Sequence, residues 1–121
     1  MILLSILTPL ALGLTQLPEQ KLIPGRCVAF LWTRSETPVR IAMVDESAQF
    51  LRLARGRQIL DIARVSPGIY AGHGMTVTLN LEFAERQGLT DGSLVESGVM
   101  RFDRPGQDSI ALPVGGMRAC R

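Results

Sequence analysis

The sequence predicts an all-β protein, either a small antiparallel β-sandwich or a barrel of about seven strands. Three observations carry this prediction. Apolar residues recur at every second position in several short segments, as in strands with one buried face. Glycine- and proline-marked turns separate these segments at intervals of about 8–12 residues, the spacing of sandwiches and barrels. Finally, the only two cysteines, Cys27 and Cys120, lie near the two ends of the region with strand-like periodicity.

The first two strands are expected in the segments 27–33 and 39–43. From Cys27 the apolar side chains alternate, with Val28, Phe30 and Trp32 on one face. Alternation returns after Pro38, which suits the first position of a strand because proline has no amide hydrogen to donate to a neighbour.

Residues 50–64 predict a β-hairpin. Its turn is Arg55-Gly56-Arg57, where glycine supplies the positive φ of a tight connection. A helix over Ala48–Ala54 is the alternative, because apolar residues there also fit one helical face. The glycine at 56 and the β-branched residues that follow it favour the hairpin.

The C-terminal half predicts three more strands. Residues 75–84 alternate cleanly, which is typical of an antiparallel strand with one face in water. A strand over 94–102 follows the turn at 85–93, and Arg104-Pro105-Gly106-Gln107 suits a type II turn. The last strand carries Ile110, Leu112 and Val114 on one face, and Gly115-Gly116 then bends the chain toward Cys120.

The segment Met1–Gly13 is apolar and contains no charged side chain. It is shorter than the roughly 20 residues that a membrane-spanning helix needs, and it has the length of a signal-peptide core. We therefore expect a signal peptide over 1–13, cleaved after Gly13, an extended lead-in over 14–26 and a single β domain over 27–121. The alternative is an N-terminal strand or helix that packs on the domain.

Export would place the protein in an oxidising compartment, the periplasm or the exterior, where disulfides persist. A Cys27–Cys120 disulfide joining the first strand to the last is therefore expected. The alternative is a pair of free buried thiols, since unpaired cysteine packs as a small apolar residue. The two cysteines are too far apart in the sequence for a CxxC redox motif.

Charge and composition exclude some functions. The formal net charge is +2, and no nucleic-acid-binding motif is present, so binding to nucleic acid is not expected. Twelve of the thirteen basic residues are arginine, a side chain that pairs with carboxylates and phosphates. A bias in genomic base composition would give the same arginine content without any function.

Catalytic, metal and cofactor sites are not predicted. The single histidine, His73, has no GxSxG nucleophile motif to serve, so a small hydrolase using it is the weaker alternative. One histidine and two disulfide-bonded cysteines cannot form a zinc site. Asp45, Glu46 and Asp91 lack the ligand spacing of a calcium loop, and the scattered acids do not suggest a glycosidase pair.

The best positional signal is a group of arginines on the predicted hairpin: Arg52, Arg55, Arg57 and Arg64. Such a patch could contact an anionic partner, such as lipid headgroups, cell-wall polymer or an acidic protein groove. The alternative is a charged sheet edge that discourages edge-to-edge aggregation. Nearby acids such as Asp61 would neutralise part of the patch.

Two resemblances follow from these segments. The ending Leu112–Cys120, together with the opening Arg26–Ala29, resembles small exported bacterial β-proteins of uncharacterised function. The layout with one cysteine first and one last is similar to periplasmic lysozyme inhibitors of the MliC type. Leu51-Arg52-Leu53 before Gly56, and Gly68-Ile69-Tyr70, add to that similarity. The second resemblance implies a compact, disulfide-closed barrel.

The sequence thus predicts a periplasmic or secreted, non-enzymatic β-domain that binds a protein or an envelope component, without a cofactor or a transmembrane span. One alternative is a lysozyme-inhibitor-like protein, in which a loop with a basic residue enters an acidic catalytic groove. Another is a structural subunit of an envelope assembly, to which residues 14–26 donate a strand.

Overall fold

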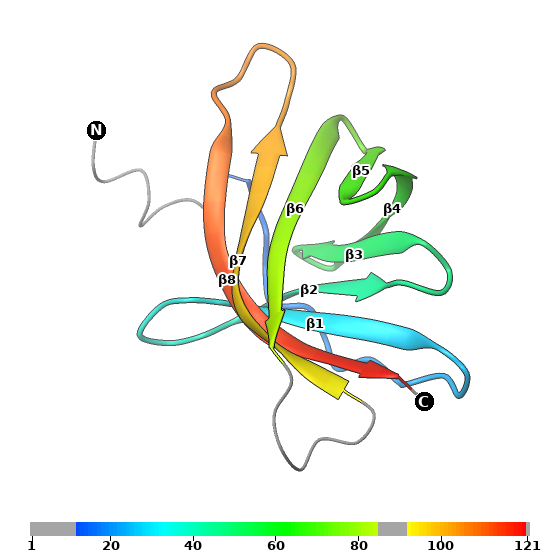
Figure 1. The fold of residues 1–121 in the computed structure, drawn as a ribbon. Coiled ribbons are helices and arrows are strands. Elements are labelled where there is room, and N and C mark those ends of the chain that lie inside the picture. Colours follow the sequence, from blue (N-terminus) through cyan, green and yellow to red (C-terminus); the bar gives the residue numbers. More distant parts are fainter. Residues whose placement is uncertain (1–11, 85–91, 121) are drawn as a thin grey trace.

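The computed structural model describes residues 12–84 and 92–120. These residues form a closed barrel in which each strand pairs with the next in the sequence and the last pairs with the first (Figure 1). All eight strand pairs are antiparallel. The strands are β1 (Cys27–Thr33), β2 (Arg40–Asp45), β3 (Phe50–Arg55), β4 (Gln58–Ser66), β5 (Ile69–Gly72), β6 (Met75–Ala84), β7 (Gly92–Asp103) and β8 (Ile110–Cys120).

The all-β prediction is confirmed, and of its two alternatives the chain adopts the barrel. The described residues form eight strands rather than about seven, because the short strand β5 was not anticipated. The hairpin predicted over 50–64 is present as β3 and β4, so the helical alternative for 48–54 is wrong. Gly56 has φ of +63° at its turn. The amide of Gln107 donates to the carbonyl of Arg104 at 3.1 Å, closing the predicted turn.

A disulfide joins Cys27 to Cys120, as predicted, across the seam where β1 meets β8. The two cysteines are direct partners in the register of that seam. Further along the seam, Gly116 lies against the backbone of β1. A Cβ atom at Gly116 would lie 2.9 Å from the carbonyl carbon of Phe30. The seam therefore requires the absence of a side chain at this position.

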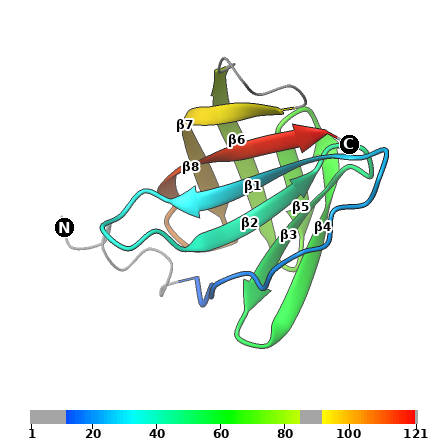
Figure 2. The ribbon, with the colours of Figure 1, turned by 90° about the horizontal axis from the view of Figure 1, so that it is seen from below.

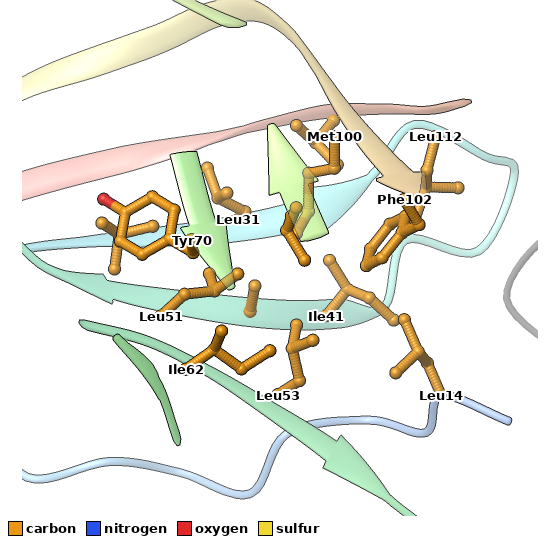
Figure 3. Close-up of a cluster of buried hydrophobic side chains, with 14 of the residues drawn as sticks. Leu14, Leu31, Ile41, Leu51, Leu53, Ile62, Tyr70, Met100, Phe102 and Leu112 are labelled. Carbon is orange, nitrogen blue, oxygen red and sulfur yellow. The ribbon is translucent and has the colours of Figure 1, made fainter. Parts of the chain in front are cut away.

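The barrel interior is filled by apolar side chains from every strand, and its most enclosed members include Leu31, Leu53 and Phe102. Figure 3 shows Leu14 of the lead-in and Phe102 on one side of this core and Tyr70 on the other. Leu12 and Leu14 belong to the same buried cluster. One end of the barrel is thus closed by residues that precede the first strand.

The lead-in packs along the outside of the barrel (Figure 2). The amide of Thr15 donates to the carbonyl of Ala54 at 2.9 Å, and the amide of Leu17 to that of Arg40 at 2.8 Å. The Leu17 side chain is fully buried in an outer cluster with Val28, Met43 and Ala54. These bonds place the lead-in against β2 and β3 of its own chain. Cleavage after Gly13 stays a prediction.

Candidate functional site

The two ends of the barrel differ. We call the end that carries Cys27 and Cys120 the disulfide end; the turns at Gly56 and His73-Gly74 lie at the opposite end, which Leu12 and Leu14 close. At the disulfide end a cavity of about 220 Å³ opens between the strands. We call this cavity the mouth pocket. Its lining residues are Ala29, Val44, Glu46, Gly68, Tyr70, Leu79, Leu81 and Phe83.

The apolar wall of the mouth pocket comes mainly from β6. Alternation along this strand, predicted from the sequence, directs Leu79, Leu81 and Phe83 to the side that also carries the fully buried Val77. Leu79 and Leu81 pack against the main core, whereas Phe83 is 48% exposed at the rim. The pocket is therefore an apolar continuation of the core that reaches the surface.

An arginine and a glutamate from distant parts of the chain meet at the rim. Residues of β8 alternate, so Arg118 follows Val114 and Gly116 on the inward side, opposite Ala29 of β1. Its Nε–H donates to Oε2 of Glu46 at 2.6 Å. The guanidinium carbon lies 5.9 Å from the centre of the Phe83 ring, within the range of a cation–π contact. The rim thus places charged groups beside an apolar pocket.

Tyr70 contributes the other polar group of the mouth pocket. Its side chain is 5% exposed and lies at the disulfide end of the core (Figure 3). Burial raises the pKa of the Tyr70 hydroxyl above its ordinary value; the charge of Arg64 opposes this shift and that of Glu46 adds to it. The hydroxyl therefore stays protonated at neutral pH and can donate a hydrogen bond.

The volume of the mouth pocket limits what can enter it. Pockets for drug-sized molecules occupy about 300–1,000 Å³, whereas a cavity of about 150 Å³ can hold a benzene ring. At about 220 Å³ the mouth pocket fits one aromatic ring or one branched aliphatic group. It does not fit a long acyl chain.

No family model, no curated protein and no solved structure matches this chain. The chemistry of the mouth pocket is therefore inferred from its own residues. Sequence reasoning did not find Tyr70 or Arg118 as site residues, although one signal for Arg118 was present. In the alternation of the last strand, an arginine occupies a position that should face the barrel interior.

A buried carboxylate holds the backbone in place at the turn that carries Glu46. Asp45 at the end of β2 is 2% exposed and accepts hydrogen bonds from Arg26 at 3.0 Å and from the Ala48 amide at 2.8 Å. In the same turn, the Ser47 hydroxyl accepts from the Cys27 amide at 3.0 Å. These contacts fix the β2–β3 turn, and with it Glu46, against the start of β1.

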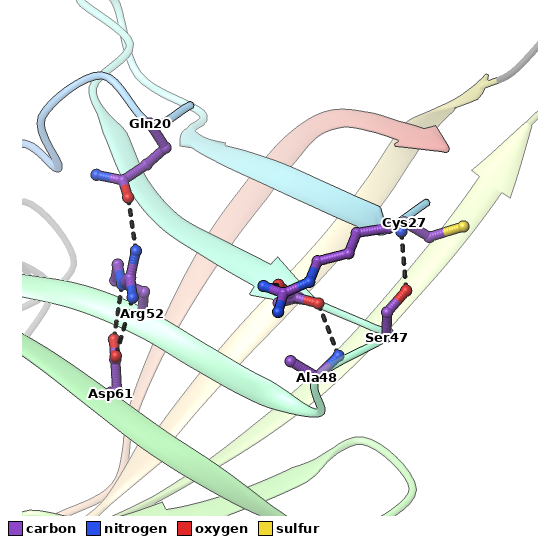
Figure 4. A network of polar contacts seen from close by, with 8 residues as sticks. Gln20, Cys27, Ser47, Ala48, Arg52 and Asp61 are labelled. Atoms are coloured by element: carbon purple, nitrogen blue, oxygen red, sulfur yellow. Dashed lines mark hydrogen bonds and ion pairs between the residues drawn. The ribbon is translucent and has the colours of Figure 1, made fainter. Parts of the chain in front are cut away.

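The predicted arginine patch is divided in the structure. Arg52 donates to both carboxylate oxygens of Asp61, at 2.7 and 2.9 Å, and to Gln20 at 2.8 Å (Figure 4). The hydrogen bond to Asp61 is the main reason that the pKa of Arg52 is raised. Its charge is therefore largely matched within the protein.

The other three arginines lie at two separate ends. Arg55 ends β3 and Arg57 lies in the β3–β4 turn, at the end opposite the disulfide, and the Arg55 side chain packs beside Gly13. Arg64 lies at the disulfide end of β4, opposite Tyr70 in the register. The six residue-to-residue steps from Gln58 to Arg64 span about 20 Å of strand. Arg64 therefore lies near Tyr70 at the disulfide end, away from Arg55 and Arg57.

His73 forms part of a turn. It is exposed between β5 and β6 and has φ of 51°, and Gly74 after it has φ of 75°. Positive φ at both central residues defines a type I′ hairpin turn. A conformational role in the turn accounts for this position, at the end of the barrel remote from the mouth pocket.

Two of the three acids considered as metal ligands form ion pairs with arginines. Asp45 pairs with Arg26 and Glu46 with Arg118, whereas Asp91 lies outside the described residues. Over residues 12–84 and 92–120, no group of three or more metal-ligating side chains comes together. The same residues include no helix of the length and apolarity needed to cross a bilayer.

A larger but shallow hollow of about 500 Å³ lies elsewhere, beside Trp32, Pro38 and Gly115. Its polar groups are already engaged. Arg34 donates to the backbone carbonyls of Val114, at 3.2 Å, and Glu96, and the Thr33 and Ser35 hydroxyls bond to each other at 3.1 Å. The mouth pocket is therefore the better candidate for ligand binding, because it is the more enclosed of the two and, within the part of the chain that the structure describes, its Tyr70 hydroxyl forms no hydrogen bond.

Proposed function

We propose that this chain is an exported, non-enzymatic binding barrel whose mouth pocket receives a small apolar group of a protein or envelope component. The observation that carries the proposal is the asymmetry of the barrel. Leu14 of the lead-in, with Leu12 before it, closes one end, whereas the disulfide end has an apolar cavity of about 220 Å³ with polar groups at its rim. Convergent polar groups around an apolar pocket are the usual form of a binding site.

Location outside the cytoplasm is supported by the Cys27–Cys120 disulfide, since structural disulfides form and persist in oxidising compartments. A disulfide beside the pocket also suits a binding role. It ties β8, which carries Arg118, to β1, which carries Ala29, and so holds two walls of the mouth together.

The proposal is tested by titrating methyl-labelled protein with toluene, a neutral ring of suitable size, and following its NMR spectrum. Saturable shifts at the methyl groups of Leu79 and Leu81 are expected. The variant Ala29→Leu, which extends a side chain into the pocket, should abolish these shifts. Ala63→Leu adds the same side chain at an exposed position of β4 and should leave them unchanged. Shifts confined to exposed methyls such as those of Val65 and Val99 would contradict the proposal.

A second function, lysozyme inhibition, is supported by one observation besides the resemblance in layout. Arg57 is exposed in the turn between β3 and β4, where its guanidinium could enter an acidic groove. A turbidity assay with several lysozyme types tests this function. Inhibition that weakens in Arg57→Ala is expected, whereas absence of inhibition in every lysozyme type would exclude it.

A further inference from the structure

We propose that the mouth pocket recognises a small apolar carboxylate, with its ring or branched chain in the cavity and its carboxylate on the guanidinium of Arg118. This inference rests on the proposed function and names the chemistry of the ligand. The carboxylate could belong to a free small acid or to the C-terminal residue of a partner polypeptide, since both present the same groups.

The free hydrogen-bonding capacity of Arg118 is the first argument. A guanidinium carries five N–H donors, and a planar carboxylate can accept two of them in parallel. In the structure the Nε of Arg118 donates to Glu46, and neither of its Nη atoms is bonded to a residue within 12–84 or 92–120. One edge of the guanidinium is thus held by Glu46, and the other can receive a second carboxylate.

The charge around the mouth pocket is the second argument. Among residues 12–84 and 92–120, Arg118 beside Glu46 and Arg64 opposite Tyr70 place two positive charges near the lining of the pocket, and Glu46 places one negative charge there. Arg64 forms no ion pair with a described residue, and its charge reaches as far as the Tyr70 hydroxyl. The charges of these described residues therefore favour an anion over a cation.

The third argument is the combination of an apolar floor with a neutral donor. Leu79 and Leu81 offer no partner for a charged group, so the carboxylate must stay at the rim while the apolar part enters. The protonated hydroxyl of Tyr70 can donate to the same carboxylate or to a water beside it. The cavity volume limits the apolar part to one ring or one branched group.

The ligand pair phenylacetate and phenylacetamide tests this inference, because the two share a ring and differ in charge. Wild-type protein should bind the acid roughly tenfold more tightly than the amide, the difference expected for one charge-assisted interaction. Equal affinities would overturn the carboxylate assignment while leaving the proposed function intact. Absence of binding by both, and by toluene, would overturn the two proposals together.

Three variants show which residue causes the preference for phenylacetate over phenylacetamide. Arg118→Gln should make the affinities for the acid and the amide about equal. Glu46→Gln removes the competing carboxylate and should raise the preference several-fold. Arg101→Gln is the matched control, since Arg101 also donates its Nε–H to one acid, Asp103, but lies toward the other end of the barrel. A preference that survives in Arg118→Gln would show that Arg118 is not the recognising group.

A second ligand pair identifies the source of the carboxylate. Gly-Gly-Phe with a free C-terminus and the same peptide as its amide present one ring on a short chain. Binding of the free peptide but not of its amide, at least as tightly as phenylacetate, would assign the pocket to a polypeptide C-terminus. Tight binding of phenylacetate without binding of the peptide would assign it to a free acid.

Discussion

Gly116 on β8 lies so close to Phe30 on β1 that no side chain fits between the two strands. A Cβ atom at residue 116 would lie 2.9 Å from the carbonyl carbon of Phe30 and 3.2 Å from the Cα of Leu31, and it would overlap the Phe30 carbonyl oxygen. These neighbours are backbone atoms, so relief requires the two strands to separate. We expect Gly116→Ala to lower the free energy of unfolding by about 3 kcal/mol or more, as measured by urea denaturation.

Gly72→Ala is the control for this substitution. A Cβ atom there would lie 3.4 Å from a methyl group of Ile62, close to ordinary contact. Its effect on the free energy of unfolding should stay within about 1 kcal/mol. Equal effects of the two substitutions would show that the seam between β1 and β8 is looser than the structure indicates.

Removal of the disulfide should lower stability strongly. The cysteines are separated by 93 positions, and a loop of that length, when cross-linked, stabilises by roughly 4–5 kcal/mol through the entropy of the unfolded chain. Denaturation of the Cys27→Ala, Cys120→Ala double variant, compared with the oxidised wild type, measures this effect. A loss below about 1 kcal/mol would mean that seam hydrogen bonds alone hold the barrel closed.

The lead-in should behave as part of the domain. Leu17 is fully buried against Val28 and Met43, so Leu17→Ala should lower the free energy of unfolding by about 2–5 kcal/mol. Leu22 is 37% exposed in the same segment, and Leu22→Ala should change the free energy of unfolding by less than about 0.5 kcal/mol. Thermal denaturation of both variants provides the comparison; similar melting temperatures would indicate that the lead-in does not pack on the barrel.

The turn at His73 should tolerate, and even favour, asparagine. Its φ of 51° is a conformation that asparagine adopts more readily than histidine. We expect His73→Asn to raise the free energy of unfolding by about 0.5 kcal/mol and Gly74→Ala to lower it by about 1–2 kcal/mol. Any hydrolytic activity of the protein that disappeared in His73→Asn would contradict the turn role.

Tyr70 should make stability decline in alkali. Burial raises its pKa in the folded state, so the unfolded chain loses this proton at lower pH than the folded one. The stabilisation that the protonated Tyr70 hydroxyl gives to the folded state is complete below the pKa of tyrosine in the unfolded chain, about 10. It is lost as the pH rises through the pKa of Tyr70 in the folded protein. Between about pH 9 and pH 12, the stability of Tyr70→Phe should therefore fall less steeply than that of the wild type. Parallel pH profiles would show that Tyr70 ionises as in water.

Local features of the fold could be predicted from the sequence because each depends on neighbouring residues. The turn at Gly56, the alternation over 75–84 and the turn closed by Gln107 are of this kind. Strand β5 was missed because Ile69–Gly72 is only four residues long, too short to display a period. The packing of Leu17 was missed because an isolated leucine in a proline-containing segment has no periodicity.

The mouth pocket could not be predicted, because it depends on barrel closure. Glu46 and Arg118 are 72 residues apart and meet only when β8 pairs with β1. The arginines between residues 52 and 64 show that residues close in the sequence can also lie far apart in the fold. These residues are close in sequence, but an extended hairpin separates Arg55 from Arg64 by most of its length.

Closure of the seam also has a kinetic consequence. Apart from β1 with β8, every strand pairs with its neighbour in the sequence, so those contacts have low contact order and can form while the chain is still largely unfolded. The seam instead requires a loop of almost the whole barrel, the costliest closure in chain entropy. We expect it to form last, so that the two thiols meet only in a nearly complete barrel and their oxidation marks the end of folding.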